Sequence, residues 1–294
     1  MSQKQAQHPA LKEGNSAVIT GGASGIGFAA AKAFIGLGMN VMIADMKSEK
    51  LKAAGAELAA LAEKKGTKAL TYAADVSDLS ALEELECAAV QAFGKVNVLM
   101  NNAGIQPETD ILGKQMPWDR IIDVNLLGVI NGTRIFTPGM IAHGEPALII
   151  NTGSKQGITT PPGNPAYNVS KAGVKAFTEA LQHDLRNREN CKVEAHLLIP
   201  GFVFTPLTAG GRTEKPEGAW TPEQTVDFML KSLEAGDFYI LCPDGEVDRE
   251  TDEKRMMWAM GDIVENRPPL SRWHPDYYHA FIDFLSGTPK ELKD

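Results

Sequence analysis

The feature that most constrains the fold of this chain is a regular alternation of short apolar runs with longer helix-forming stretches. Apolar or β-branched runs occupy 16–20, 41–44, 68–73, 96–100, 147–151 and 193–199. Helix-forming segments lie at about 25–37, 48–65, 78–93, 117–135 (with room to continue past Pro138) and 165–188. Near-continuous apolar strands separated by helices predict an α/β fold, a doubly wound parallel sheet that helices bury on both faces.

A change in composition near residue 240 divides the chain. The run at 238–242 reads as one more strand, followed by a charged helix near 249–264 and a Pro- and aromatic-rich tail. We therefore expect a polar arm at 1–13, a single doubly wound domain of about seven strands at 14–242, and a C-terminal helical extension at 243–294. We expect the extension to pack over the domain, although it is equally suited to cover a partner subunit or to wall a pocket.

Composition and charge exclude several classes of protein. Of the 294 residues 43% are hydrophobic and 22% charged, which is ordinary for globular domains, and the net charge of -8 argues against binding nucleic acid. No apolar run approaches the length of a membrane span, and the first fifteen residues lack the apolar centre of a secretory signal. We expect a cytoplasmic protein with no membrane partner.

The cysteines and histidines give no sign of a disulfide framework or a metal site. The three cysteines, Cys87, Cys191 and Cys242, are far apart and form no CxxC motif, which favours reduced thiols. The six histidines form no HExxH motif and no His-Cys cluster. The sequence therefore predicts that no metal is bound.

A glycine-rich turn, TGGASGIG at 20–27, joins the first expected strand to the first expected helix. A helix that begins near Gly25 presents unpaired N–H groups and the positive end of its dipole to an anion. The absence of side chains at Gly21, Gly25 and Gly27 lets a pyrophosphate approach the backbone. Glycine is also common in turns for conformational reasons alone, so the placement between strand and helix carries the prediction.

Asp45 closes the second expected strand, 18 residues beyond Gly27. A carboxylate in this position accepts hydrogen bonds from both ribose hydroxyls of adenosine and repels a 2′-phosphate, which favours NAD over NADP. Lys47 softens that preference. The alternative interpretation is an ordinary surface carboxylate at a strand end.

Ser154, Tyr167 and Lys171 form a candidate proton-handling group. Tyr167 and Lys171 lie four positions apart at the start of an expected helix, hence one turn apart on one face, and Ser154 follows the fifth strand. A phenol with a pKa of about 10 needs stabilisation of its charged form to act as a general base near pH 7. A neighbouring ammonium can supply much of it, and an oxidised nicotinamide adds positive charge. The alternative is a YxxxK pair that arose by chance on a surface helix.

Taken together, these motifs resemble the short-chain dehydrogenase/reductase family of the Tyr-x-x-x-Lys type. The resemblance covers about 14–206. Its landmarks, in family order, are TGGASGIG at 20–27, Asp75-Val76, NNAG at 101–104, Asn125, Ser154, YNVSK at 167–171 and Pro200-Gly201.

The resemblance implies a Rossmann-like NAD-binding fold and assigns roles to individual residues. Tyr167 would be the catalytic acid/base, Lys171 would lower its pKa and hold the nicotinamide ribose, Ser154 would stabilise the substrate oxygen, and Asn125 would anchor a water relay. Without the resemblance, Asp75, Asn102 and Asn125 would pass as structural residues. The implied cofactor contacts are Gly21, Ser24, Ile26, Asp45, Asp75, Val76, Asn102, Tyr167, Lys171, Val203 and Thr205.

The predicted reaction is reversible hydride transfer between NAD(H) and a secondary alcohol or ketone. The apolar candidates for the substrate pocket are Ile158, Phe202 and Trp220, each equally suited to the core, and they suggest an uncharged, fairly bulky substrate; Lys155 and Gln156 leave room for a polar substituent. An epimerase, dehydratase or enoyl reductase on the same fold, or a non-catalytic dinucleotide sensor, are the alternatives.

Two segments depart from the family pattern. The stretch after Thr205 is short and Gly-rich, which indicates an abbreviated or mobile substrate lid, and the usual closing-strand turn is replaced by PDGEV and the aromatic tail. The helices near 117–142 and 165–188 carry more apolar positions than one sheet face needs. The resemblance suggests that these helices pair across a two-fold axis between subunits, so we expect a homodimer or homotetramer.

Overall fold

A computed structural model of the protein describes residues 8–245 and 247–287, so most of the polar arm (1–7) and the last seven residues (288–294) lie outside the described structure. The centre is a seven-stranded sheet in the order β3-β2-β1-β4-β5-β6-β7, with every neighbouring pair parallel. The strands are β1 (Ser16–Thr20), β2 (Asn40–Asp45), β3 (Ala69–Ala73), β4 (Val98–Asn101), β5 (Ala147–Thr152), β6 (Val193–Ile199) and β7 (Tyr239–Leu241).

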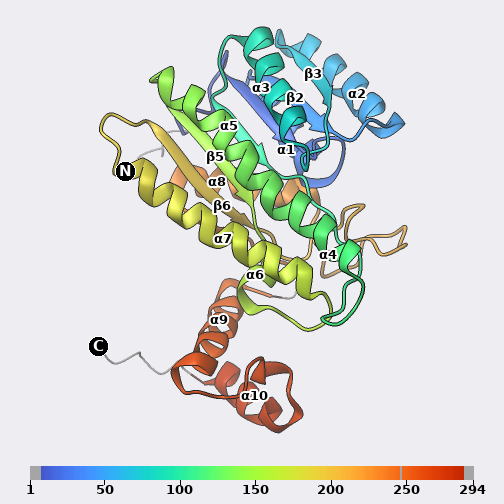
Figure 1. The fold of residues 1–294 in the computed structure, drawn as a ribbon, viewed down its shortest axis with the longest axis vertical. Coiled ribbons are helices and arrows are strands. Elements are labelled where there is room, and N and C mark those ends of the chain that lie inside the picture. Colours follow the sequence, from blue (N-terminus) through green and yellow to red (C-terminus); the bar gives the residue numbers. More distant parts are fainter. Residues whose placement is uncertain (1–7, 246, 288–294) are drawn as a thin grey trace.

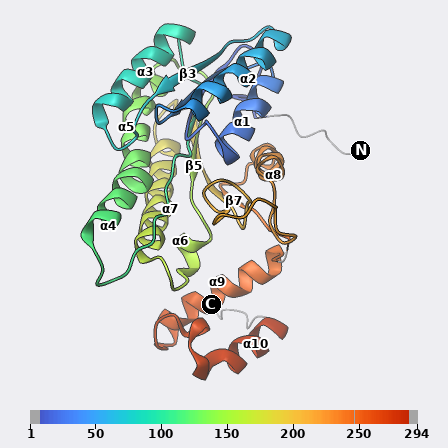
Figure 2. The same ribbon diagram turned by 90° about the vertical axis from the view of Figure 1, so that its right-hand side faces the viewer.

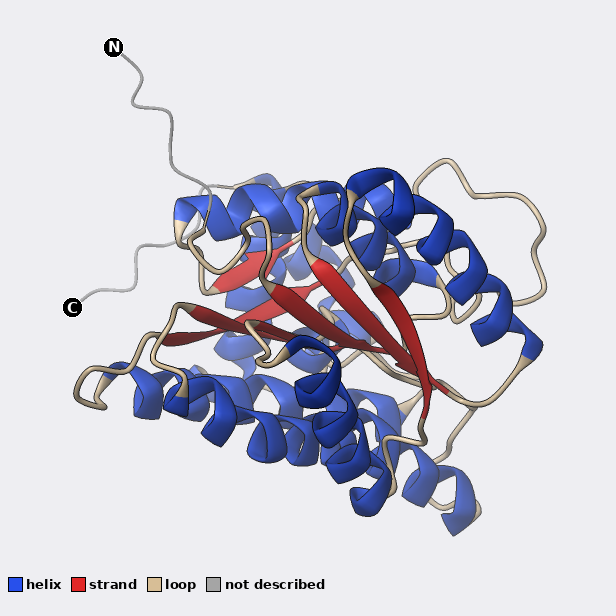
Figure 3. Cartoon of the chain, turned by 90° about the horizontal axis from the view of Figure 1, so that it is seen from above, coloured by secondary structure: helices blue, strands red, loops and turns tan. Residues whose placement is uncertain are grey.

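Helices cover both faces of the sheet, which confirms the predicted α/β fold (Figures 1 and 3). One layer holds α1 (Gly25–Gly36), α2 (Glu49–Lys65) and α8 (Pro222–Ala235). The opposite layer holds α3 (Leu79–Phe93), α4 (Gln115–Ile122), η1 (Asp123–Leu127), α5 (Gly128–Ala142) and α7 (Pro165–Arg186), with the short α6 (Gln156–Thr159) beside α7.

The local sequence explains where the elements begin and end. Every residue of β1, β4 and β5 is buried, as expected for central strands of a parallel sheet, whereas the edge strand β3 is partly exposed. Ser48 and Asp78 accept hydrogen bonds from the first turns of α2 and α3, and Gly66 ends α2 in the left-handed conformation. These caps fix the helix ends within a residue of the expected positions.

Two parts of the helical layers differ from the expectation. The helix expected at 117–135 begins at Gln115, passes through the π-helical turn η1 and continues past Pro138 to Ala142. The helix α8 was not among the expected elements. The sequence does carry a signal for the start of this helix, namely Thr221 with Gln224 three positions on. In the structure the two residues form a capping box, with reciprocal hydrogen bonds of 2.8 and 3.2 Å.

Beyond β7 the chain forms α9 (Arg249–Val264), the 3₁₀ turns η2 (Ser271–Trp273) and η3 (Pro275–Tyr277), and α10 (Tyr278–Ser286). Figures 1 and 2 show α9 and α10 extending away from the sheet. They pack around Trp258, whose ring lies 5.3 Å from the rings of both Phe281 and Phe284. Across the described residues, no helix combines the length and apolar character that crossing a membrane requires.

Candidate active site

A cleft of about 990 Å³ opens at the carboxyl ends of the strands, where the strand order reverses between β1 and β4. This edge of a doubly wound sheet is the usual ligand site of such folds. The structure brings every sequence-predicted site residue except Asn125 onto its wall. Those residues are Gly21, Ser24, Ile26, Asp45, Asp75, Val76, Asn102, Ser154, Tyr167, Lys171, Val203 and Thr205.

The glycine turn between β1 and α1 forms one wall of the cleft because it has no side chains. Gly21 has a φ of 65°, and a Cβ there would lie 2.7 Å from the Cα of Ala103. At Gly27 a Cβ would lie 2.5 Å from the Gly21 carbonyl oxygen. The Asn102 side chain donates to the carbonyls of Thr20 and Gly21, both at 3.2 Å, and so ties the turn to the end of β4.

The N-terminus of α1 fits a bound phosphate group. Its N-cap residue, Ser24, makes no side-chain capping hydrogen bond, although α2, α3 and α7 are capped by side chains. The first-turn N–H groups of α1 therefore have no side-chain acceptor among the described residues, and Ser24, Gly25 and Ile26 line the cleft. Together with the glycine turn, this arrangement suits the pyrophosphate of a dinucleotide.

Two carboxylates lie at the far end of the cleft. Asp45 accepts hydrogen bonds from the backbone N–H groups of Ala23 (3.0 Å) and Met46 (2.8 Å), which hold it at the end of β2 facing the glycine turn. Asp75 accepts from both the N–H and the hydroxyl of Ser77. Burial alone would raise the pKa of Asp75, but these hydrogen bonds bring it below its ordinary value. Both carboxylates are hydrogen-bond acceptors suited to hydroxyl and amine groups.

The proton-handling residues lie at the opposite end of the cleft. Tyr167 and Lys171 project from the first turns of α7, which Asn164 caps, and Ser154 follows β5. The Ser154 hydroxyl lies close enough to the Tyr167 phenol to lower its pKa. The Lys171 amine lies 5.7 Å from the centroid of the Tyr167 ring and donates to the Thr152 carbonyl at 2.8 Å. The expected constellation is therefore assembled in space.

Burial dominates the charge states of this pair. It raises the pKa of Tyr167 to about 12, and the Ser154 hydroxyl offsets only part of this rise. Burial likewise lowers the pKa of Lys171 to about 8. In the protein alone, Tyr167 therefore keeps its proton at neutral pH, and the predicted lowering of the phenol's pKa requires positive charge beyond that of Lys171.

Asn125 is buried behind the cleft, in the π-helical turn η1. Its side-chain oxygen accepts from the Ile105 N–H at 2.8 Å, and its amide donates to the Ile105 carbonyl at 2.9 Å and to the Ser170 hydroxyl at 3.4 Å. Because the side chain is committed to these partners, it holds the loop after β4 against α7. The water relay expected from Asn125 would have to use its backbone carbonyl.

A buried polar network that the sequence analysis did not identify lies beneath the cleft. Asn101 donates to Thr133 at 3.0 Å and to Asn151 at 2.9 Å, and Asn151 donates to Thr178 at 3.0 Å. The network joins β4 and β5 to α5 and α7. A Cβ at Gly132 would lie 2.6 Å from the Asn101 side-chain oxygen, so the network requires a glycine at this position of α5.

The substrate side of the cleft agrees with the expected wall only in part. Phe202 lines it, together with Gln106, Pro161, Pro162 and Leu207. Ile158 is partly buried and packs against the apolar cluster around Val174 and Leu197. Trp220, also partly buried, packs against the core with its ring edge-to-face to that of Phe228, 5.8 Å between centroids. These two side chains pack against the core and do not line the cleft. The segment after Thr205 forms short turns along the cleft.

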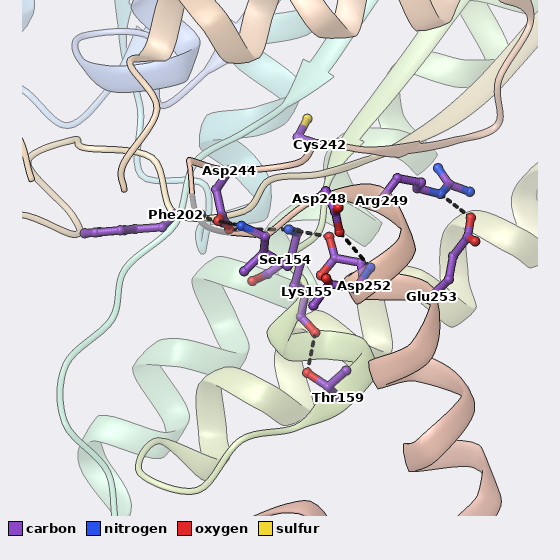
Figure 4. Close-up of polar contacts among 12 residues, drawn as sticks. Ser154, Lys155, Thr159, Phe202, Cys242, Asp244, Asp248, Arg249, Asp252 and Glu253 are labelled. Carbon is purple, nitrogen blue, oxygen red and sulfur yellow. Dashed lines mark hydrogen bonds and ion pairs between the residues drawn. The ribbon is translucent and has the colours of Figure 1, made fainter. Parts of the chain in front are cut away.

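Lys155, next to Ser154, is paired with carboxylates from the C-terminal part of the chain (Figure 4). Its amine lies 2.5 Å from the Asp252 carboxylate of α9 and 3.4 Å from that of Asp244, which follows β7. All three side chains are at most 16% exposed. The Asp244 carboxylate also accepts from the backbone N–H of Phe202 at 3.3 Å. The cluster thus links α9 to two loops of the cleft.

A second polar cluster, at the other end of β6, joins His8, Glu194 and His196. The Nε2 atoms of the two buried histidines lie 3.7 and 3.6 Å from the Glu194 carboxylate. The Nδ1 atoms of the two histidines have separate partners: His8 Nδ1 accepts the Ala10 N–H at 3.1 Å, and His196 Nδ1 lies 2.9 Å from the Asp237 carbonyl oxygen. The two histidines lower the pKa of Glu194 well below its usual range, and the cluster links the N-terminal arm to the start of β6.

Comparison with known proteins supports the same class of enzyme. Residues 15–216 match the family model of the short chain dehydrogenases. The 3-oxoacyl-acyl-carrier-protein reductase FabG of Thermotoga maritima is 38% identical over 77% of this chain and 85% of its own length. The 3beta-hydroxysteroid dehydrogenase 2 of Eggerthella lenta is 32% identical over 73% and 80%. A crystal structure of a Burkholderia phymatum short chain dehydrogenase/reductase in complex with NAD has 30% identity and a TM-score of 0.78, and it covers 87% of this chain and 96% of its own.

The fold and the cleft define a dinucleotide-binding α/β oxidoreductase. With the family model matching well over half of the chain, the protein belongs to the short-chain dehydrogenase/reductase family, whose members act on alcohol and ketone substrates with NAD(P).

Proposed function

We propose that this protein catalyses reversible hydride transfer between NAD(H) and a secondary alcohol or ketone, with Tyr167 as the general acid/base. The observation that carries the proposal is the placement of Tyr167, Ser154 and Lys171 in the same cleft as the glycine turn and Asp45. Bound NAD would supply hydride acceptance at its nicotinamide ring, together with a positive charge in its oxidised form. The chain supplies position and proton transfer.

The proton chemistry follows from the environment of Tyr167. In the reducing direction the phenol holds its proton at neutral pH, because burial raises its pKa to about 12, and it can give that proton to a carbonyl oxygen. Ser154, which lies beside the same phenol in the cleft, would hold that oxygen. In the oxidising direction the phenol must ionise, and the Lys171 amine, 5.7 Å from the ring centroid, provides positive charge on the ring face. Asn125 would position this region by holding Ile105 and Ser170.

The choice of NAD over NADP rests on Asp45. Its carboxylate is held at the end of β2 by the Ala23 N–H, beside the glycine turn that would bind the pyrophosphate. A ribose with free hydroxyls can donate to it, whereas a 2′-phosphate would meet a like charge. The Burkholderia phymatum relative, which was solved with NAD, is consistent with this choice.

The proposed substrate is uncharged and fairly bulky. Phe202, Leu207 and Pro161 give the substrate side an apolar character. Two relatives carry names that refer to 3-oxoacyl and steroid substrates, which are large and have secondary alcohol or ketone centres.

We also propose a cytoplasmic location and assembly into a homodimer or homotetramer through the helices α4–α5 and α7, which expose Leu127 and Val169.

The decisive experiment is a spectrophotometric screen of secondary alcohols, including hydroxysteroids and 3-hydroxy esters, with NAD⁺ and NADP⁺ in parallel. The matching ketones are tested with the reduced cofactors. We expect alcohol-dependent formation of NADH with a preference for NAD⁺. Conversion of substrate without net change in nicotinamide absorbance would indicate an epimerase or dehydratase. Binding of NAD with no turnover of any substrate would indicate a dinucleotide sensor.

A further inference from the structure

Lys155 is a cation on the wall of the cleft, directly after Ser154 in the chain. An ammonium group at this position is a natural partner for a substrate carboxylate. In this protein the position is already taken, because the amine lies 2.5 Å from the Asp252 carboxylate and 3.4 Å from the Asp244 carboxylate. The lysine is therefore committed to the chain's own anions.

The local structure holds both carboxylates in place. Asp248 caps α9 by accepting the Thr251 N–H at 2.9 Å, which fixes the first turn that carries Asp252. The Asp244 carboxylate accepts the N–H groups of Phe202 and Val247. A side chain at Gly201 would not fit, because its Cβ would lie 2.6 Å from the Asp244 carboxylate and 3.1 Å from the Lys155 amine. Figure 4 shows Lys155 between the two aspartates.

Two carboxylates face the single ammonium group of Lys155. Burial raises the pKa of Asp252 and the charge of Asp244 adds to that rise, whereas Lys155 and the charge of Arg255 lower it. A carboxylate that entered the cleft beside Lys155 would meet Asp244, which lines the same wall. An uncharged substrate meets no such repulsion. The cluster therefore discriminates by charge.

We propose that Asp244 and Asp252 are specificity-determining residues that pair Lys155 internally and so reserve the cleft for uncharged ketones against keto acids. This inference rests on the proposed function and refines its substrate class. It also assigns a role to the C-terminal extension, since α9 carries Asp252 to Lys155 on the cleft wall.

The test compares binding of 3-oxobutanoate and its ethyl ester by calorimetry in the presence of NADH. All proteins carry Tyr167→Phe, so that the heat reports binding and not turnover. Asp252→Asn should strengthen binding of the acid at least about tenfold, equivalent to about 1.4 kcal/mol, and change binding of the ester less than about twofold. Asp244→Asn should act in the same direction. The double variant Lys155→Gln/Asp252→Asn should lose the gain.

Glu253→Gln is the matched control, because Glu253 is the next residue of α9 and pairs with Arg249 on the exposed side. Thermal unfolding of each variant checks that it is folded. The proposal is overturned if neither aspartate variant binds the acid more tightly, if Glu253→Gln gives the same gain, or if the gain survives removal of Lys155. Turnover of ketones by the unmodified protein tests the proposed function separately, so the two failures are distinguishable.

Discussion

The sheet and the C-terminal extension (243–287 in the described structure) contribute to the cleft in different ways. The sheet delivers Ser154 at the end of β5, Asp45 at the end of β2, and Tyr167 and Lys171 within one turn of α7. The extension contributes through ion pairs between groups 89 and 97 residues apart, since Asp244 and Asp252 both reach Lys155. The first arrangement follows from strand and helix geometry, and the second depends on side-chain pairing.

This difference separates two properties of the enzyme. The groups that we propose to bind dinucleotide and to move a proton are held by the most buried part of the molecule, where β1, β4 and β5 have no exposed residue. The groups that we propose to select substrates by charge come from a segment outside the sheet, whose helices pack mainly on each other around Trp258. Specificity can therefore change in the extension while the chemistry is retained.

The largest expected effect comes from Tyr167→Phe, which tests whether the residues placed by the sheet and α7 carry out the proton transfer. Removal of the phenolic oxygen should lower kcat for ketone reduction by about 10³-fold, because the proton donor is lost. NADH affinity, measured by fluorescence titration, should stay within about threefold. Tyr239→Phe is the control, since it removes a hydroxyl bonded to Glu179 outside the cleft. Equal activity of the two variants would remove Tyr167 from the mechanism.

Trp258→Ala tests whether the extension and the sheet unfold independently. Trp258 is 5% exposed, and its indole N–H donates to Ser271 at 2.9 Å, so truncation should destabilise the extension by about 3 kcal/mol or more. Hydrogen exchange should accelerate across 256–287 and remain slow in β1, β4 and β5. Tyr278→Ala, on an exposed position of the same segment, should leave exchange unchanged. Faster exchange in the central strands would show that both regions form one cooperative unit.

Lys171→Met tests whether burial of the Lys171 amine lowers the free energy of unfolding of the protein. The pKa of Lys171 falls from 10.5 to about 8, and at about 1.4 kcal/mol per pH unit the buried charge costs about 3 kcal/mol. Between pH 8 and about 10 the unfolded chain binds a proton that the folded chain has lost, so the unmodified protein gains stability as pH rises.

In denaturant titrations, Lys171→Met should lack this gain and should be the more stable protein at pH 7, although inactive. Lys175→Met, one turn further along α7 and partly exposed, is the control and should keep the pH dependence. If the stability of both variants rose equally with pH, burial of the charged Lys171 amine would cost no stability.

The smallest expected effect is that of Asp45→Ala. Loss of the acceptor at the end of β2 should weaken NAD⁺ binding about tenfold and narrow the gap to NADP⁺, because the like charge facing a 2′-phosphate is removed. Parallel titrations with both cofactors measure the change, with Asp184→Ala on the exposed end of α7 as control. Unchanged affinities would place the ribose elsewhere.

Most of the fold and of the candidate site could be predicted because each prediction rested on local geometry. Continuous apolar runs indicated buried strands, and strand ends placed Asp45, Asp75 and Ser154 on one edge. The spacing of Tyr167 and Lys171 placed both on one face of α7. The resemblance to the family supplied what local patterns could not, such as Val203 and Thr205.

The remaining features depend on contacts between distant segments. Trp220 and Ile158 are apolar in either a core or a pocket, so only the packing decides between them. The pairing of Lys155 with Asp252 has no periodic signal, because it depends on the path of the chain after β7. The pKa of Tyr167 depends on the depth of burial, which spacing does not report.

The π-helical turn at Asp123–Leu127 also bears on how this sequence can vary over time. A π turn holds one residue more than an α turn, so deletion of one residue there would restore a plain α-helix while α4 and α5 kept nearly the same faces toward the sheet. Asn125 would lose its place opposite Ile105, and the loop after β4 would lose its support. A relative with one residue fewer at this turn would therefore keep the fold and lose this contact.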